Sequence, residues 1–258
     1  MRRRTPGAAF VAEEQKKLLA ALPRLAAPRI AAELEELVRP ERRDKLRRAI
    51  DARLRSVTVV MDAPYDPHNG AAVMRSCDAF GLATMHVVER QTGFLAAKPI
   101  ARGSERWVEV KTYSAVEPAV AALRASGLEL VATHPNGELL PEDLRHLPGV
   151  AIVLGNEREG ISKDLADACA RSVRIPMRGF AESLNVSVTA AILLQHATTG
   201  RPGDLPQEER DLLYARALVL SFPHAAELLY ARGILTEPLP PAALALIEGA
   251  EDDDDDRA

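Results

Sequence analysis

Residues 175–188 read IPMRGFAESLNVSV, a stretch in which a strand ends, a loop turns and an apolar helix begins. Gly179 lies in the loop, and Ser183 stands where a helix N-cap is expected, because its hydroxyl can accept a bond from a free backbone N–H. Asn185 and Ser187 then interrupt an otherwise apolar helix, where buried polar side chains need partners. The stretch carries more polar groups than a strand-to-helix connection requires.

A second polar segment lies upstream, where residues 152–162 read IVLGNEREGIS. An apolar strand here runs into a glycine-containing turn at the carboxyl edge of a predicted parallel sheet, where open α/β folds bind ligands. The pattern is neither GxGxxG nor a Walker loop. Glu157 would also repel a phosphate group. Taken alone, the segment indicates only a turn.

A further polar segment lies closer to the N-terminus, where residues 62–75 read DAPYDPHNGAAVMR. It follows a strand and opens a helix. Pro64 and Pro67 stiffen the loop, and Asn69 is expected at the helix N-cap. Arg75 is then expected on the second turn. Taken alone, this segment predicts a capped helix with a surface arginine.

Short apolar runs alternate with helical patterns between these segments, which predicts an α/β fold with a mostly parallel sheet. The expected strands are 56–61, 84–88, 108–112, 128–133, 150–154 and 172–175. The expected helices are about 70–80, 115–126, 162–170 and 184–199. Two or three further helices are expected over 207–248, after a Gly/Pro linker.

The domain organisation follows from these patterns and from the charge distribution. We expect a basic helical extension over 1–55, the α/β domain over 56–199, a helical extension over 200–250 and an acidic disordered tail over 251–258. In the first extension, Pro23 and Pro28 interrupt the helical pattern of residues 9–38.

The net charge of −4 conceals a basic N-terminal region. Residues 1–58 hold 15 Lys/Arg and 8 Asp/Glu, which favours a polyanionic partner. A helix over about 40–55 places Arg43 and Arg47 on one face, four residues apart. In the alternative interpretation, these arginines pair with acidic neighbours and only solubilise the helix; those neighbours are Glu41, Asp44 and Asp51.

Composition excludes several classes of protein. Cys77 and Cys169 are far apart, with no CxxC and no clustered histidines, so neither a metal site nor a disulfide framework is expected. No apolar run reaches the roughly 18 residues that a membrane span needs. The apolar stretch after the first arginines is too short for a signal peptide, so we expect a cytoplasmic protein. Aromatic residues are 4%, too few for a base-stacking platform.

Taken in their order along the chain, with their spacing, the three segments resemble the signature motifs of the SpoU/TrmH branch of the SPOUT RNA methyltransferases. The matching elements are D-P-x-N with an arginine six residues after the asparagine, then L-G-x-E-x-x-G-I-S, then I-P-M-x-G with S-L-N-V-S-V. The resemblance spans residues 40 to about 200. The flanking helices also resemble those of the tRNA-methylating members, whereas residues 1–38 have no recognised counterpart.

The resemblance implies a fold, a reaction and an assembly. The domain over 56–199 would be a SPOUT methyltransferase domain whose segment 150–199 is tucked into a trefoil knot. The chain would be a homodimer that uses S-adenosylmethionine to methylate an RNA ribose 2′-oxygen. The implied substrate is the D-loop guanosine at position 18 of tRNA, with ribosomal RNA as the alternative.

The resemblance also assigns residues. The cofactor would contact Thr133, Leu154, Gly155, Ile175, Met177 and Leu184. Arg75 would lie next to the 2′-hydroxyl and the RNA, either as proton acceptor or as a positioning group, and Asn69 would help to position the substrate. The active loops would be ordered by Glu157, Ser183 and Asn185. The basic charge of residues 1–58, and not the resemblance, adds the prediction that Arg43 and Arg47 bind RNA phosphates.

One departure from the tRNA-enzyme pattern is Ala181-Glu182, where Val-Gln is more usual. Glu182 adds negative charge near the expected RNA path, which leaves the exact substrate open. Two other classes of protein remain as alternatives. One is an RNA-binding homologue without catalysis, and the other is a nucleotide-dependent oxidoreductase, against which the missing glycine fingerprint argues.

Overall fold

The structure is a computed structural model that describes residues 26–89, 103–156, 158–221 and 224–235. The chain divides into two compact units, one over Arg53–Asp204 and the other combining the helices before residue 53 with those after residue 204. The acidic tail expected over 251–258, the first part of the basic extension and Glu157 lie outside the described residues.

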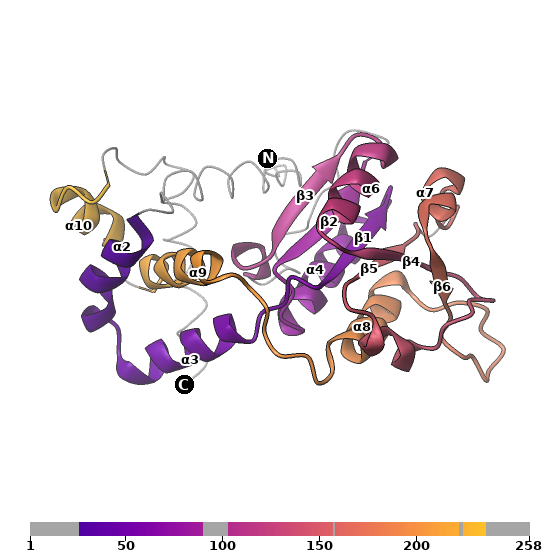
Figure 1. Cartoon of the computed structure of the whole chain (residues 1–258), viewed down its shortest axis with the longest axis horizontal. Helices are drawn as coiled ribbons and strands as arrows, with labels where there is room; N and C mark the ends of the chain where they lie inside the picture. Colours follow the sequence, from indigo (N-terminus) through magenta and orange to yellow (C-terminus); the bar gives the residue numbers. More distant parts are fainter. Residues whose placement is uncertain (1–25, 90–102, 157, 222–223, 236–258) are drawn as a thin grey trace, which may run out of the picture. The chain divides into compact units, whose positions relative to one another are not determined.

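A six-stranded sheet forms the centre of the first unit, and all its strands run parallel in the order β3-β2-β1-β5-β4-β6 (Figure 1). The strands are β1 (Val57–Asp62), β2 (Thr84–Val88), β3 (Glu109–Tyr113), β4 (Glu129–Thr133), β5 (Val150–Leu154) and β6 (Arg171–Val173). The α/β fold with a mostly parallel sheet, expected from the sequence, is confirmed.

Helices cover both faces of the sheet. α4 (Pro67–Ala79) and α8 (Val186–Thr198) contribute to the hydrophobic cluster on one face, and α6 (Val116–Ala125) and α7 (Lys163–Ala168) contribute to the cluster on the other. Along β1, Val59 and Met61 belong to the first cluster and Val60 to the second. Because both faces are covered, the two central strands, β1 and β5, are buried along their whole length. The 3-10 turns η3 (Ser104–Arg106) and η4 (Pro141–His146) complete this unit.

The start of α4 differs from the sequence prediction. The helix begins at Pro67, and Asp66 is the N-cap, with its carboxylate accepting a hydrogen bond of 2.8 Å from the backbone N–H of His68. Proline suits the first helical position, because its missing N–H would have no partner there. Asn69 therefore lies within the first turn instead of at the cap, and Arg75 lies on the third turn instead of the second.

The start of α8 also differs. Asn185 is the N-cap, and its side-chain oxygen accepts a hydrogen bond of 2.8 Å from the backbone N–H of Ser187. Ser183 lies in the preceding loop, so its predicted capping role is wrong. β6 is shorter than expected, because it pairs with β4 over three residues only. The loop into α8 consequently begins at Arg174.

The second unit contains α2 (Ala27–Leu34), η2 (Glu35–Leu37), α3 (Pro40–Asp51), α9 (Gln207–Val219) and α10 (Ala225–Ala231). α2 and α3 both pack against α9, and Ile30, Leu34 and Leu212 are buried. Pro28 falls in the first turn of α2, where it does not interrupt hydrogen bonding. Among the described helices, none is both long and apolar enough to cross a membrane.

Candidate functional site

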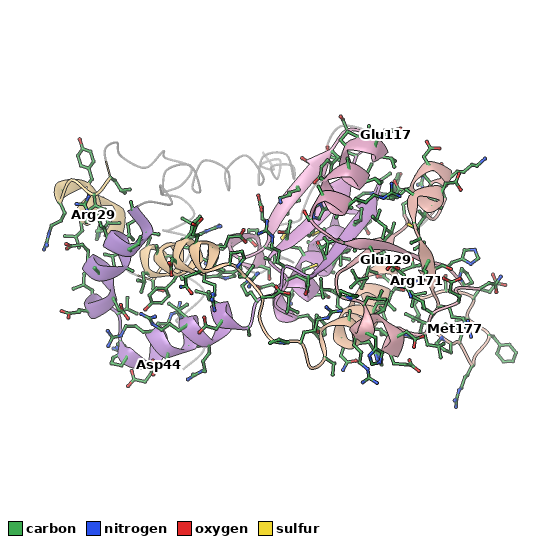
Figure 2. The ribbon with its side chains drawn as sticks, viewed as in Figure 1. Arg29, Asp44, Glu117, Glu129, Arg171 and Met177 are labelled. Carbon is green, nitrogen blue, oxygen red and sulfur yellow. The ribbon has the colours of Figure 1, made fainter. Side chains whose placement is uncertain are left out.

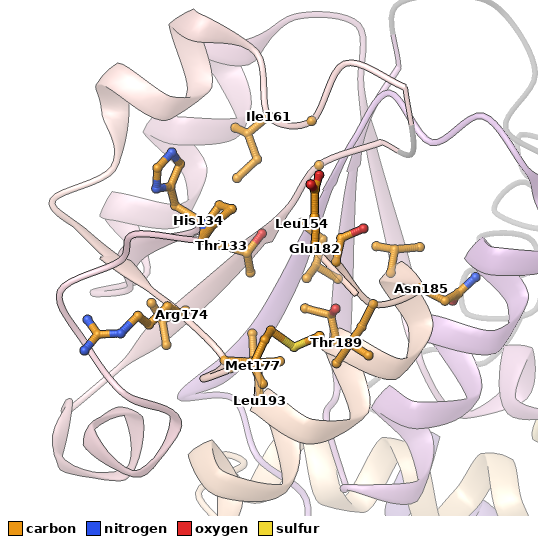
Figure 3. A pocket seen from close by; sticks show the side chains of 18 of the residues that line it. Thr133, His134, Leu154, Ile161, Arg174, Met177, Glu182, Asn185, Thr189 and Leu193 are labelled. Carbon is orange, nitrogen blue, oxygen red and sulfur yellow. The ribbon is translucent and has the colours of Figure 1, made fainter. Parts of the chain in front are cut away.

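An open cavity of about 1080 Å³ lies at the carboxyl edge of the sheet (Figure 3). It is lined by the ends of three neighbouring strands, represented by Thr133 of β4, Leu154 of β5 and Val173 of β6. Open α/β folds bind ligands at this edge. The cavity belongs to the β5-β4-β6 half of the sheet, to one side of the reversal in strand order between β1 and β5.

The cavity brings together most of the site residues expected from the sequence. Its lining includes all six of the expected cofactor residues: Thr133, Leu154, Gly155, Ile175, Met177 and Leu184. Two of the expected catalytic residues, Ser183 and Asn185, line it as well. These residues come from three loops that are separated in the chain, so only the folded sheet places them around one space.

The turn after β5 has a geometry that requires glycine. A Cβ on Gly155 would lie 2.3 Å from the carbonyl carbon of Gly160, much closer than atoms can approach. Gly160 itself has a φ of +70°, a conformation that side chains disfavour. Asn156 closes the turn, since its side-chain oxygen accepts bonds of 2.9 and 2.7 Å from the backbone N–H groups of Arg158 and Glu159.

Two contacts join this turn to the loop after β1. Asp62 is 1% exposed, and its carboxylate accepts a hydrogen bond of 2.6 Å from the backbone N–H of Ser162. The Arg158 guanidinium lies 3.7 Å from the centre of the exposed Tyr65 ring, a cation–π contact. Sequence reasoning assigned no role to these residues, because each contact joins positions about 100 residues apart and leaves no periodic signal.

A hydrogen bond links two of the expected catalytic residues. The side-chain amide of Asn185 donates to the side-chain oxygen of Asn69 over 3.0 Å. The oxygen of Asn185 meanwhile accepts from the backbone N–H and the hydroxyl of Ser187, at 2.8 and 2.6 Å. Asn185 therefore caps α8 and connects it to the first turn of α4, at the rim of the cavity.

Arg75 stands apart from this group. It is exposed on α4 and is not among the residues that line the cavity. Within the described part of the chain, no hydrogen bond or ion pair holds its guanidinium. The structure thus places Asn69, Ser183 and Asn185 at or beside the cavity, and leaves Arg75 available for a group that comes from outside the chain.

Ionic contacts hold β6 in place, the strand that leads into the loop between β6 and α8 (the cavity loop). Arg171 of β6 forms two hydrogen bonds with the carboxylate of Glu129 in β4, at 2.5 and 2.8 Å (Figure 2). These bonds to Arg171 hold the pKa of Glu129 below its usual value. Arg174 then donates to the carbonyl oxygen of Gly137. The loop that follows β6 therefore starts from a fixed position.

One of the two arginines expected to bind RNA is engaged within its own unit. The guanidinium of Arg47 lies 2.5 Å from the Glu35 carboxylate and 4.3 Å from the centre of the Tyr214 ring. The Tyr214 hydroxyl also donates to Glu35, over 3.2 Å. The hydrogen bond from Arg47 lowers the pKa of Glu35. The ion-pair partners expected for Arg47 were therefore wrong, since its partner is Glu35; Asp51 lies 3.7 Å from Arg210.

Thiol and metal chemistry find no support in the described residues. Burial raises the pKa of Cys77 to about 12 and that of Cys169 to about 11, so both thiols stay protonated at neutral pH. In the described ranges, no group of three or more His, Cys, Asp or Glu side chains could hold a metal ion.

Comparisons with known proteins identify the family. The model of the SpoU rRNA Methylase family matches residues 56–195. The tRNA (guanosine(18)-2′-O)-methyltransferase of Escherichia coli strain K12 is 31% identical over 163 residues, which cover 63% of this chain and 71% of that protein.

Solved structures with a similar fold are also found. The A. aeolicus TrmH/SpoU tRNA modifying enzyme has the same fold, with a TM-score of 0.55 and 22% identity over 83% of this chain and 97% of that one. The SpoU methyltransferase AviRb from Streptomyces viridochromogenes, solved in complex with AdoMet (S-adenosylmethionine), matches with a TM-score of 0.50 and 27% identity. That match covers 58% of this chain and 60% of AviRb.

Proposed function

The chain belongs to the SpoU rRNA methylase family, and from this we propose that it transfers a methyl group from S-adenosylmethionine to the ribose 2′-oxygen of an RNA. The observation that supports this proposal most directly is the cavity at the carboxyl edge. It is lined by every residue expected to hold the cofactor, and it adjoins the hydrogen bond between Asn69 and Asn185.

The residues around the cavity fit this cofactor. Its volume of about 1080 Å³ is ample, since sites for ligands of this size occupy about 300–1,000 Å³. Leu154, Ile175 and Met177 supply apolar surface for an adenine ring, and Thr133 and Ser183 supply hydroxyl groups. When bound, S-adenosylmethionine supplies a methyl group already activated on a positively charged sulfur.

The acceptor side needs a ribose hydroxyl held close to the methyl group, with a route for its proton. Asn69 and Asn185 lie at the rim of the cavity, where their amides can orient the ribose. Arg75 serves best as a positioning group, because a guanidinium offers N–H donors and no acceptor. Its exposed side chain suits contact with an RNA phosphate or the 2′-hydroxyl.

A homodimer is part of the proposal. Arg75 does not line the cavity of its own chain, so a second copy would have to bring this residue to the methyl group. A closed two-fold dimer can do so, because each copy then completes the site of the other. Exposed apolar side chains in and after the cavity loop, which are Phe180, Leu184 and Val188, suit burial against a partner.

Complementation between two inactive variants tests the shared site. Arg75→Ala removes the positioning group, and Gly155→Ala disrupts the cofactor turn through the close approach to Gly160. A random mixture of the two should recover about a quarter of wild-type activity, because half the dimers then contain one intact site. No recovery, or a fully active monomer in sedimentation at working concentration, would contradict the dimer. Circular dichroism of each variant confirms that both are folded.

The proposed substrate is the D-loop guanosine at position 18 of tRNA. The E. coli relative is named for this nucleotide, and helices flank the methyltransferase domain on both sides in the sequence. The test uses a tRNA transcript, the same transcript with 2′-deoxyguanosine at position 18, and a ribosomal RNA fragment. Methylation of the first alone supports the proposal. Methylation of the deoxy transcript or of the ribosomal fragment would contradict it, and the second result would favour the ribosomal alternative.

The remaining features of the proposal concern the fold and the cell. We include a trefoil knot formed by residues 150–199, a catalytic domain over 56–199, helical extensions over 1–55 and 200–250, and action on RNA in the cytoplasm. The packing of α8 against η4, together with the common cavity of the loops after β5 and β6, is compatible with the knotted arrangement. Arg43 and Arg47 in α3 are the proposed RNA contacts of the first extension.

A further inference from the structure

Glu182 stands out among the residues of the cavity. It precedes Ser183 in the loop between β6 and α8, and its side chain lines the cavity (Figure 3). The residue is exposed to the open space, and no hydrogen bond or ion pair joins its carboxylate to another described residue. A carboxylate kept without an internal partner is available to a ligand.

No hydrogen bond or ion pair joins Glu182 to the other titratable side chains of the described lining. The titratable side chains among the described lining residues are His134, Arg174 and Glu182. Arg174 donates to the Gly137 carbonyl oxygen, and the ring nitrogen of His134 accepts from the backbone N–H of Asn136 over 3.1 Å. Glu182 is therefore the single acid of the described lining, and it faces a space that the proposed function fills with a cationic cofactor.

The position of Glu182 indicates which part of that cofactor it faces. The methyl group must point to the acceptor side, which is the rim where Asn185 bonds to Asn69. Glu182 lies three residues before Asn185 in the same loop and lines the same cavity. A carboxylate on this side would face the sulfonium of a bound cofactor, and the charge of that sulfonium is lost when the methyl group is transferred and the sulfur becomes a neutral thioether.

We propose that Glu182 recognises the positive charge of the sulfonium and makes the cavity prefer S-adenosylmethionine to its product, S-adenosylhomocysteine. The inference rests on the proposed cofactor site. The carboxylate exchanges no atom in the reaction; it stabilises a charge that the cofactor carries and the product lacks. Coulomb attraction between an exposed carboxylate and a nearby cation corresponds to a preference of about 3- to 10-fold, which decreases as salt is added.

The test is a binding titration of the whole protein, free of RNA, with three ligands. S-adenosylmethionine carries the sulfonium, sinefungin carries an ammonium at the same place, and S-adenosylhomocysteine is neutral there. Glu182→Gln, which keeps the shape and removes the charge, should raise the Kd of the two cationic ligands about 3- to 10-fold and that of the neutral ligand less than about 2-fold. The difference should shrink at high salt.

The matched control is Glu117→Gln, since Glu117 is an exposed carboxylate on α6 that does not line the cavity. This variant should leave all three Kd values unchanged. Equal weakening of the three ligands by Glu182→Gln would overturn the inference, because it would place the carboxylate at a group that they share. A change confined to the KM for RNA would also overturn it. If the wild-type protein bound none of the three, the cofactor site itself would be wrong.

Discussion

The two edges of the sheet use charged side chains in opposite ways. At the amino edge, Arg53 is 6% exposed and donates to the carbonyl oxygens of Leu82 and Trp107, which lie just before β2 and β3. Arg201 makes similar bonds ahead of the two central strands, β1 and β5, to Ser56 and to the Pro148 carbonyl oxygen. At the carboxyl edge, Arg75 and Glu182 have no such partner within the described residues.

The difference indicates which charged side chains stabilise the fold and which are available to bind a ligand. A buried guanidinium that satisfies several carbonyl groups contributes to folding, and its loss leaves those groups without partners. An exposed charge without a partner contributes little to stability. Substitution of Arg53 or Arg201 should therefore change stability, whereas substitution of Arg75 or Glu182 should change binding or catalysis.

Arg53→Met is the strongest test of the amino edge. The substitution keeps an apolar stem of similar length but removes the bonds to Leu82, Trp107 and the Asp78 carboxylate, the last at 3.0 Å. We expect the free energy of unfolding to fall by about 3 kcal/mol, because buried acceptors lose their donors. Urea denaturation measures this change. Arg75→Met is the matched control from the other edge, and a similar loss in it would remove the contrast.

Arg75→Ala tests the carboxyl edge in the converse way. The rate of methyl transfer at saturating substrates should fall about 100-fold or more, the usual contribution of a positioned group in proton-transfer chemistry. The Kd for S-adenosylhomocysteine and the free energy of unfolding should stay near the wild-type values, since Arg75 neither lines the cavity nor bonds to a described residue. A variant that keeps more than about a tenth of the wild-type rate would contradict this role.

His86, a buried titratable residue in β2, allows a test of stability by change of pH. Its ring is 5% exposed, and its Nδ1 lies 3.1 Å from the hydroxyl of Tyr113. Burial, aided by the charge of Lys111, lowers the pKa of His86 from 6.5 to about 4. The unfolded chain therefore binds a proton that the folded chain rejects between these values. Stability that is present above pH 6.5 is lost as the pH falls toward 4.

The contribution of His86 to the free energy of unfolding should fall by about 2 kcal/mol between pH 7 and pH 5. It is measured as the difference in unfolding free energy between the wild type and His86→Gln at both pH values, because the other titrating groups contribute equally to the two proteins. If both proteins lost the same stability on acidification, His86 would not be the neutral buried group that the structure indicates.

Sequence patterns predicted the elements of this fold more accurately than their ends. The bounds of β2 and β5 agree with the prediction, because apolar runs flanked by polar residues define buried strands well. α4 was placed too late, since Pro67 was interpreted as a loop residue although it fills the first helical position. Asn185 was recognised as unusual but not as the cap, because Ser183 satisfies the same local pattern two residues earlier.

The site could be predicted only as far as its motifs extend. All six expected cofactor residues line one cavity. Two of the motifs mark the loops after β5 and β6, whereas Thr133 at the end of β4 was assigned by the family resemblance outside the motifs. The contacts of Asp62 and Arg158 could not be predicted, since they join loops that only the strand order brings together. Glu182 was expected near the RNA path, and only the folded loop places it in the cavity lining.

The same contrast, between a charged side chain with a partner and one without, occurs on the single helix α3, where we expect the smallest effects. Arg43 and Arg47 are four residues apart in α3, and sequence alone gives them the same role. Arg47 bonds to Glu35 and lies against the Tyr214 ring, whereas the guanidinium of Arg43 makes no hydrogen bond or ion pair with a described residue and acts on Glu35 only through its charge. Arg43 can therefore move to a phosphate at little cost, but Arg47 would first have to leave its partners.

Single substitutions separate the two roles. Arg43→Ala should flatten the log–log dependence of RNA affinity on salt by about 0.7 to 0.9, the effect of one lost phosphate contact, and leave kcat unchanged. Arg47→Ala should change this slope less and lower the free energy of unfolding by about 0.5 to 1 kcal/mol, through the loss of a half-exposed ion pair and a cation–π contact. If both arginines bind phosphates, the double variant flattens the slope by about 1.4 to 1.8, and Arg47 must exchange Glu35 for RNA on binding. An unchanged slope in the double variant would mean that RNA docks elsewhere on the protein, and that the basic face of α3 serves only the folded unit.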